Sequence, residues 1–311
     1  MNRPVVATMI GDPCGIGPEI VVKALAQDLG PARQLLVGDA RVVREAVALT
    51  GVPLAVNAID AFENARYATG SIDVLDPGTL DLADVTVGQV SAGSGRAVSG
   101  WWNLAKDLAR DGRVGAIVKA PVNSEAIKLG GGGPQGGVRP GQTFLFLITG
   151  PLRVIHLTDH IPLREVFGHL TEAAVLHLIR LTHDSLRGWG VAAPRIGVAG
   201  INPHALGDEE QQQIAPAVHA ARELGIDAHG PVPPDSLFRL CIEGRYDCVI
   251  AHYHDQGHIA VKTWRFEGNC AVLLGEPFLG LSVAHGTAFD IAGKGIADPA
   301  SIAHAMRTAA S

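Results

Sequence analysis

The chain of 311 residues is poor in aromatic side chains and in cysteine. Aromatic residues make up 5% of it, so few large rings are available to build its cores. Its four cysteines show neither the CxxC spacing of a zinc knuckle nor the density of a disulfide-rich secreted domain. We therefore expect reduced thiols and a cytoplasmic protein.

Long apolar runs are also lacking. No stretch approaches the roughly 20 apolar residues of a membrane span, and the first residues lack the apolar core of a signal peptide. We expect no membrane partner.

Positive charge is scarce as well. Lys and Arg number 25 against 31 Asp and Glu, which gives a formal net charge of −6. Because no basic stripe is present to neutralise phosphates, we expect a small-molecule substrate and no nucleic-acid partner. An anionic substrate stays open, since a local field can oppose the net charge.

Apolar residues, in contrast, make up 47% of the chain, which is enough for two cores. Strand-like and helix-like patterns alternate almost throughout, and this alternation predicts an α/β fold. The expected strands include 5–10, 35–38, 72–75, 115–118, 153–158, 195–201, 247–251 and 271–274, and the expected helices include 19–29, 40–50, 92–110, 171–189 and 209–224.

Histidines follow three of these predicted strands. His160 and His204 come after the strands near residues 153–158 and 195–201, and His254 lies in Ala251-His-Tyr-His-Asp-Gln-Gly-His258. If the strands are parallel neighbours, the three imidazoles meet at one sheet edge, where they suit a divalent metal. The alternative for each is an ordinary surface or hydrogen-bonded histidine. The pattern alone leaves both open.

Glycine gathers in two stretches. The amides of Gly11-Asp-Pro-Cys-Gly-Ile-Gly-Pro-Glu19 face an anion in one interpretation and form only a tight turn in the other. The run 129–137 is predicted to be a mobile loop, either a lid over a cleft or a surface connection.

Four motifs stand in order along nearly the whole chain: Gly11 to Glu19, Asn202-Pro-His204, Tyr253-His-Asp-Gln-Gly257 and His285-Gly-Thr-Ala288. Together they resemble the 4-hydroxythreonine-4-phosphate dehydrogenase family of pyridoxal phosphate biosynthesis. The resemblance implies two α/β/α domains with a cleft between them, as in isocitrate and isopropylmalate dehydrogenases. It also implies a homodimer whose subunits both contribute to the site.

On this basis we expect two domains. Residues 1–120 plus 266–311 would form a discontinuous cofactor-side domain. Residues 121–265 would form a domain for metal, substrate and dimerisation.

The resemblance also implies ligands and cofactors. A divalent metal would be held by His160, His204 and His254; zinc is expected first, with cobalt, magnesium and manganese open. The stretch from His285 to Asp298 is similar to the adenosine-binding loop of isopropylmalate enzymes. It implies that NAD is contacted by His285, Gly286, Thr287, Ala288, Asp290 and Asp298. The acidic side chains suit a ribose hydroxyl better than the extra phosphate of NADP.

The implied reaction oxidises a hydroxyl beta to a carboxylate, passes hydride to NAD and releases carbon dioxide. Lys262 is expected to deliver a proton or to hold the substrate carboxylate, and an ordinary surface lysine is the alternative. Asp255 is expected to orient a ligand or to act as a base.

The substrate positions depart from the family pattern. Members with phosphate substrates carry Gly-His-Thr-Glu where this chain has Gly141-Gln-Thr-Phe144, so Gln142 and Thr143 are the expected substrate contacts. Ala271 and Gly280 replace an Asn and an Arg of those members. Losing these donors favours a non-phosphorylated carboxylate, as in terephthalate cis-dihydrodiol dehydrogenases.

The alternative substrate is 4-hydroxythreonine-4-phosphate, because Arg139 or Arg265 can replace the lost phosphate contact. Two other classes also stay open. One is a metal-dependent hydrolase, in which the histidines activate water. The other is a catalytically idle protein that senses a nucleotide.

Overall fold

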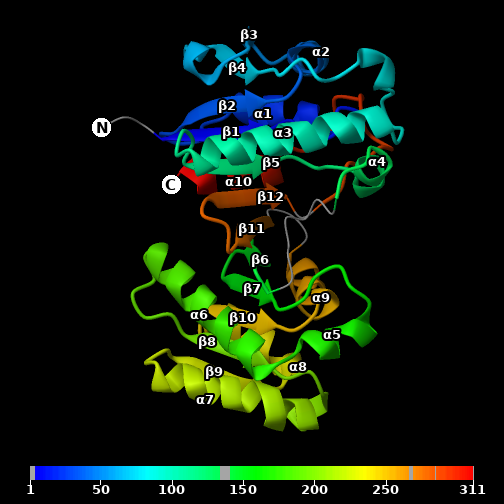
Figure 1. Cartoon of the computed structure of the whole chain (residues 1–311). Coiled ribbons are helices and arrows are strands. Elements are labelled where there is room, and N and C mark those ends of the chain that lie inside the picture. The colour runs from blue at the N-terminus through cyan, green and yellow to red at the C-terminus, as the bar shows by residue number, and fades with distance from the viewer. Residues whose placement is uncertain (1–3, 134–140, 266–268, 284, 311) are drawn as a thin grey trace. The chain divides into compact units, whose positions relative to one another are not determined.

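The computed structural model describes residues 4–133, 141–265, 269–283 and 285–310 (Figure 1). The chain divides into two compact units, residues 1–137 with 276–311 and residues 138–275. The expected domains differ from these units at both junctions. Residues 121–133 group with the first unit, and residues 269–275 group with the second.

The first unit is built on a parallel sheet with the strand order β3-β4-β2-β1-β5-β12. Its strands are β1 (Val5–Met9), β2 (Arg33–Val37), β3 (Ala55–Ile59), β4 (Ser71–Leu75), β5 (Ala116–Lys119) and β12 (Leu279–Val283). The short apolar runs of β1 and β5 are buried on both faces, as expected of central parallel strands.

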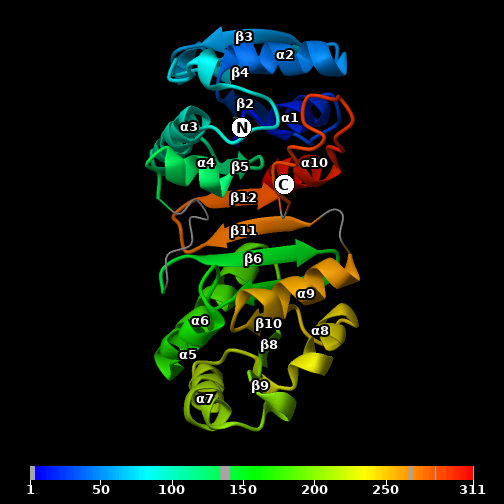
Figure 2. The ribbon, with the colours of Figure 1, turned by 90° about the vertical axis from the view of Figure 1, so that its right-hand side faces the viewer.

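Helices cover both faces of this sheet. They are α1 (Gly17–Leu25), α2 (Ala40–Thr50), α3 (Ala92–Arg110), α4 (Ser124–Leu129) and α10 (Ala300–Ala310), with short 3-10 turns η1 (Phe62–Asn64) and η2 (Leu82–Asp84). In Figure 2, α3 and α4 lie on one side of the strands, and α1, α2 and α10 lie on the other. The unit is therefore a three-layer α/β/α structure.

The second unit has a mixed sheet with the order β11-β6-β7-β10-β8-β9. Its strands are β6 (Phe144–Thr149), β7 (Leu152–His156), β8 (Ile196–Ala199), β9 (Ala228–Val232), β10 (Cys248–Ala251) and β11 (Cys270–Leu274). Strand β6 pairs antiparallel with β11 and β7, whereas the pairs β7–β10, β10–β8 and β8–β9 are parallel. Strand β6 is not among the strands predicted from the sequence, although Phe146 and Leu147 on it are buried.

Helices cover both faces of this sheet as well. They are α5 (Leu163–His169), α6 (Glu172–Gly188), α7 (Ala215–Glu223), α8 (Pro234–Ile242) and α9 (His254–Trp264), with the 3-10 turn η3 (Pro203–Ala205) and the π-turn η4 (Glu210–Ile214). In Figure 2, α8 and α9 lie on the side opposite α5, α6 and α7. The predicted α/β class is confirmed in both units.

The parallel strands β7, β10 and β8 are neighbours in that order. This confirms the condition on which the three-histidine hypothesis depends. In the segment that follows β10, His254 is the first residue of α9.

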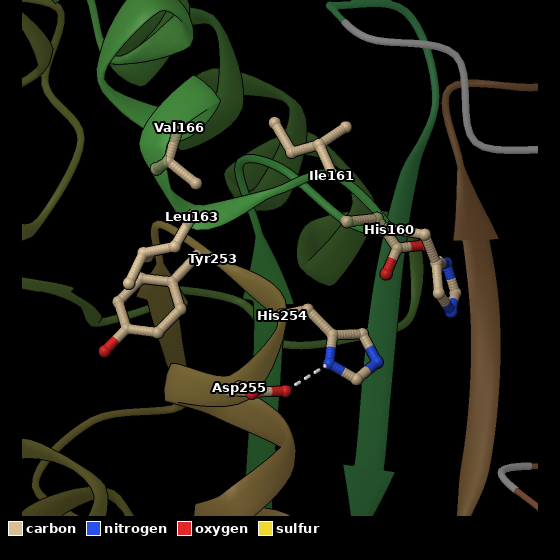
Figure 3. A pocket seen from close by; sticks show the side chains of 8 residues that line it. His160, Ile161, Leu163, Val166, Tyr253, His254 and Asp255 are labelled. Atoms are coloured by element: carbon tan, nitrogen blue, oxygen red, sulfur yellow. Dashed lines mark hydrogen bonds and ion pairs between the residues drawn. The ribbon is translucent and has the colours of Figure 1, made fainter.

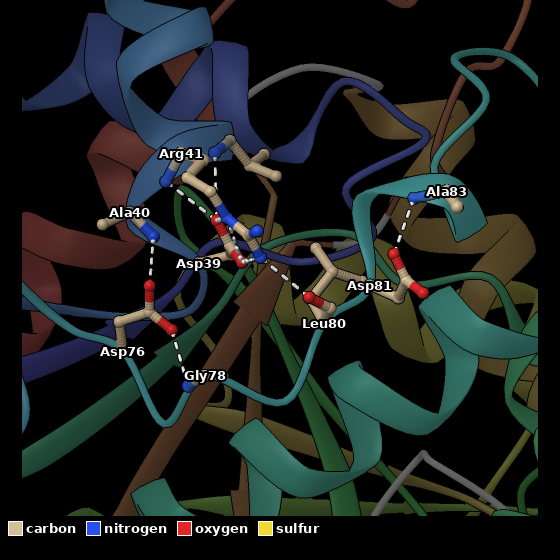
Figure 4. Close-up of polar contacts among 9 residues, drawn as sticks. Asp39, Ala40, Arg41, Asp76, Gly78, Leu80, Asp81 and Ala83 are labelled. Atoms are coloured by element: carbon tan, nitrogen blue, oxygen red, sulfur yellow. Dashed lines mark hydrogen bonds and ion pairs between the residues drawn. The ribbon is translucent and has the colours of Figure 1, made fainter.

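Acidic residues fix the strand-to-helix turns of the first unit (Figure 4). Asp39 is the N-cap of α2, and its Oδ1 accepts hydrogen bonds from the amides of Arg41 and Val42. Asp76 accepts from the amides of Ala40 and Gly78, both at 2.8 to 2.9 Å. The contacts to Ala40, Arg41 and Val42 satisfy amides that the start of α2 leaves without a partner.

All four cysteines are buried and free, which confirms the expectation of unpaired thiols. In the part of the chain that the structure describes, no helix has the length and apolar character needed to cross a membrane. The glycine-rich run begins after α4 ends at Leu129, but residues 134–140 lie outside the described residues. The lid hypothesis and the expected role of Arg139 therefore stay predictions.

Candidate functional site

One carboxylate and two imidazoles meet at the carboxyl ends of β7 and β10. The potential ligand atoms of Asp159, His160 and His254 all lie within 4.8 Å of one another. The ring centroids of the two histidines are 5.0 Å apart. A cavity of about 220 Å³ opens beside them (Figure 3), and it is lined by Asp159, His160, Ile161, Leu163, Val166, Tyr253, His254 and Asp255.

Backbone pairing beyond the two strands brings these residues together. The amide of Leu157 donates to the carbonyl of Ala251 at 2.8 Å, and the amide of Thr158 donates to the carbonyl of His252 at 3.2 Å. The Thr158 hydroxyl donates to the same carbonyl. The ends of β7 and β10 therefore stay in register up to the residues that carry the site.

Asp159 is the member of this cluster that was not among the residues predicted from the sequence. Its side chain is buried, with Oδ2 3.1 Å from His160 Nδ1, while Oδ1 has no hydrogen-bond partner among the described residues. Burial acts to raise the pKa of Asp159, but its contact with His160 and the nearby imidazoles bring it below its usual value. The same contact raises the pKa of His160.

A buried carboxylate oxygen without a partner is costly unless a cation faces it. One carboxylate and two imidazoles form a donor set that suits a divalent metal. The residues present therefore fit such an ion. A signal for Asp159 did exist in the sequence, namely its position between a strand end and a candidate ligand.

Asp255 orients the ring of His254 (Figure 3). His254 Nδ1 lies 2.8 Å from Asp255 Oδ1, so the ring donates its Nδ1 proton to the carboxylate, and Nε2 is on the side of the ring away from that contact. The hydrogen bond from His254 is the main cause that lowers the pKa of Asp255. A histidine that binds a metal through one ring nitrogen commonly donates a hydrogen bond from the other to a carboxylate, which fixes the orientation of the ring. Of the two expected roles of Asp255, this contact favours orientation of a ligand.

His204 is not part of this cluster of described residues. It is exposed, and both His204 and Ala205 have left-handed backbone conformations, with φ of 57° and 56°. The buried carboxylate of Glu210 holds this loop by accepting from the amides of Ile201 and Asn202, each at 2.7 Å. The left-handed backbone of a residue other than glycine costs about 1–3 kcal/mol and is typical of functional loops. The loop thus displays His204 on the outside of its own unit.

The predicted substrate residues Gln142, Thr143 and Lys262 do not line the cavity beside Asp159, His160 and His254. Gln142 is exposed and Thr143 is buried. The preceding residue, Gly141, lines a second cavity of about 290 Å³ together with Asp159. Lys262 is exposed on α9, about two helical turns beyond His254.

The predicted NAD residues lie in the first unit. Thr287 is buried, and its carbonyl accepts the amide of Ile16 at 3.0 Å. A Cβ atom on Gly15 would approach Thr287 Cβ to 2.8 Å, so only glycine permits this contact. Close packing thus accounts for this glycine without a bound anion, which favours the tight-turn interpretation.

Salt-bridged residues of α1 hold the other end of the same segment. Glu19 Oε1 accepts the amide of Ala297 at 2.7 Å, and Lys23 Nζ donates to the carbonyls of Gly295 and Ala297, both at 2.8 Å. Asp298 is engaged at the start of α10, where Oδ1 accepts the amide of Ala300.

The remaining predicted NAD residues are differently placed. Asp290 and Gly286 are exposed, and His285 is half-buried with Nδ1 donating to the Gly286 carbonyl. Ala288 has a left-handed backbone with φ of 42°. The segment is therefore anchored at both ends and leaves Asp290 accessible to a ligand.

Comparison with known proteins gives a consistent result. The family described as "Pyridoxal phosphate biosynthetic protein PdxA" matches residues 31–309. A putative 4-hydroxythreonine-4-phosphate dehydrogenase of Novosphingobium aromaticivorans is 47% identical and aligns with 98% of this chain and 94% of its own. A D-threonate 4-phosphate dehydrogenase of Cupriavidus necator is 42% identical over 99% of this chain and 96% of its own.

Solved structures agree. The 4-hydroxythreonine-4-phosphate dehydrogenase of Klebsiella pneumoniae superposes with a TM-score of 0.86 at 39% identity, covering 99% of this chain and 97% of that one. A terephthalate 1,2-cis-dihydrodiol dehydrogenase of Burkholderia xenovorans is more distant, with a TM-score of 0.70 at 33% identity over 99% of this chain and 98% of that one.

Proposed function

Since the chain belongs to the PdxA family and is a dehydrogenase acting on a CH–OH group, we propose that it oxidatively decarboxylates a phosphorylated hydroxy acid with NAD and a divalent metal. The observation that carries the proposal is the cluster of Asp159, His160 and His254. The hydrolase and the idle nucleotide sensor are not retained, because the family assigns dehydrogenase chemistry to the chain.

In this proposal His160 and His254 hold the metal, and Asp159 adds its unpaired oxygen. A bound divalent cation supplies a Lewis acid that makes a substrate hydroxyl more acidic. The hydrogen bond between His254 Nδ1 and Asp255 directs His254 Nε2 away from the Asp255 carboxylate, so that Nε2 is available as a metal ligand. Lys262 holds the substrate carboxylate or gives a proton after carbon dioxide leaves. Gln142 and Thr143 remain the proposed substrate contacts.

We assign the third imidazole to a second subunit. The exposed, strained loop at His204 supports this assignment, because it displays the ring away from the cluster of its own chain. The active form would then be a homodimer in which His204 of the partner subunit completes each site. The metal itself is left as zinc, cobalt, magnesium or manganese.

The anchored segment 285–298 is proposed to bind NAD, through His285, Gly286, Thr287, Ala288, Asp290 and Asp298. Its two anchors on α1 support this role, because a fixed backbone holds a cofactor with little loss of entropy. Asp290, which is exposed, suits a ribose hydroxyl.

The substrate expected first was a non-phosphorylated dihydrodiol, and the comparisons support its alternative better. Relatives at 47% and 42% identity are named for phosphorylated substrates, whereas the dihydrodiol enzyme is 33% identical. Loss of an Asn and an Arg at Ala271 and Gly280 does not by itself remove phosphate recognition. Arg265 is exposed at the end of α9 and offers a cation for this purpose.

A turnover screen tests the proposal. The purified chain with NAD and a divalent metal is offered 4-phosphohydroxy-L-threonine, D-threonate 4-phosphate and the terephthalate cis-dihydrodiol, with unphosphorylated 4-hydroxy-L-threonine as control. We expect nicotinamide reduction and carbon dioxide release with a phosphorylated acid. Both should stop on chelation and return when metal is added back. Turnover of the dihydrodiol alone would support the non-phosphorylated substrate that was expected first. Full activity after rigorous chelation would show that the reaction needs no divalent metal.

A further inference from the structure

Two more imidazoles extend the cluster toward the interior. His258 lies one turn after His254 on α9, so the two side chains share a face of the helix. Their ring centroids are 3.7 Å apart and their planes differ by 13°, which is a face-to-face stack. His156, the last residue of β7, lies 4.9 Å from His258 at an angle of 26°.

Main-chain contacts fix both inner rings. His258 Nδ1 donates to the carbonyl of His254 at 3.1 Å, and His156 Nδ1 donates to the carbonyl of Leu145 at 3.2 Å. Because a carbonyl only accepts, both Nδ1 atoms carry a proton. His156 is 1% exposed and His258 is 8% exposed.

Close packing of α9 on β7 maintains this arrangement. A Cβ atom on Gly257 would collide with the His156 ring and reach Val154 Cγ1 at 2.8 Å. The helix backbone therefore rests directly on the strand, and the next residue, His258, is held against His156. This support reaches the outer ring of His254 through the stack.

We propose that His258, backed by His156, is a positioning residue that fixes the plane of the His254 ring for metal binding. Asp255 constrains one edge of that ring through Nδ1, but a single hydrogen bond leaves the ring free to tilt about it. Stacking against the face of the His258 ring prevents this tilt. The inference rests on the metal role proposed above, and it concerns a residue outside the proposed ligand set.

The test compares two substitutions of His258. His258→Leu removes the flat ring, whereas His258→Phe keeps one of similar shape. Cobalt(II) affinity of the NAD-free protein is measured by chelator competition, together with the visible cobalt spectrum, which reports ligand geometry. We expect His258→Leu to bind cobalt about tenfold more weakly with an altered spectrum, and His258→Phe to stay within about threefold of the unsubstituted protein.

Controls separate this inference from its premise. His219→Leu removes an exposed histidine on α7 and should leave cobalt affinity unchanged. Thermal unfolding of the metal-free variants shows whether Leu only destabilises the unit. Equal affinity of His258→Leu and the unsubstituted protein overturns the positioning role alone. Equal losses with Leu and Phe overturn the stacking explanation. No cobalt binding by the unsubstituted protein overturns both the inference and the proposed metal site.

Discussion

At the scale of single residues, neighbouring histidines take different roles because their surroundings differ. Burial lowers the pKa of His252 to about 4, and its Nε2 donates to the Ala199 carbonyl, which ties β10 to β8. Burial also lowers the pKa of His258 to about 3. His160, which is exposed and beside Asp159, has a raised pKa. Among these described histidines, His160 and His254 line the cavity and are placed to bind a ligand from solution.

Asp255→Ala should weaken metal binding without removing a ligand. The change deletes the carboxylate that holds the His254 tautomer, so we expect cobalt affinity to fall by about 10-fold to 100-fold. Asp184→Ala, which changes an exposed aspartate on α6, is the matched control. Titration calorimetry with cobalt measures both. An unchanged affinity for Asp255→Ala would show that this carboxylate does not orient His254.

At the scale of elements, acidic caps decide where helices begin. Burial would raise the pKa of Asp39, but hydrogen bonds from the Arg41 side chain and from the amides of Arg41 and Val42 lower it below its usual value. Because the folded pKa is depressed, the ionised cap stabilises the first unit above the unfolded pKa of about 3.9. That stabilisation is lost as the pH falls through the folded value.

Asp39→Asn tests this cap. The amide retains an acceptor for the helix amides but loses the ion pair with Arg41, so we expect a lower melting temperature at pH 7. The difference from the unsubstituted protein should shrink as the pH falls below about 4, where the native carboxylate becomes protonated. Calorimetric scans over this range measure it. A difference that grows on acidification would contradict the assigned sign.

At the scale of the whole molecule, the proposed ligands are divided between the cluster and a separate loop. His160 and His254 are together in one chain, whereas His204 is displayed elsewhere. The proposed homodimer takes the third imidazole from a second copy of the chain.

Mixing two inactive variants tests this division. His204→Ala and His254→Ala should each be inactive, because each removes one ligand. If each site takes His204 from the partner subunit, random reassociation of the two variants should restore about a quarter of the activity. The reason is that about half of the dimers are mixed, and each mixed dimer has one intact site of its two. Activity is measured after joint unfolding and refolding, with each variant refolded alone as control. No recovery, despite mixed dimers shown by mass spectrometry, would place His204 in its own subunit's site.

Much of this protein follows from its sequence. Alternating apolar runs and helical patterns predicted the α/β class, because burial periodicity is a local property of the chain. The same patterns made β7, β10 and β8 candidate neighbours, which the structure confirms. The linear motifs also pointed to the PdxA family, whose model matches residues 31–309.

Tertiary structure decided which of these residues act together. Asp159 became a candidate ligand only because its buried oxygen lies beside His160 and His254 without a partner. The stack of His254 on His258 and His156 joins a helix to a strand about a hundred residues earlier in the chain, a separation over which local sequence carries no information on contacts. Sequence periodicity determines which residues are buried, and only the packed fold determines which polar atoms meet.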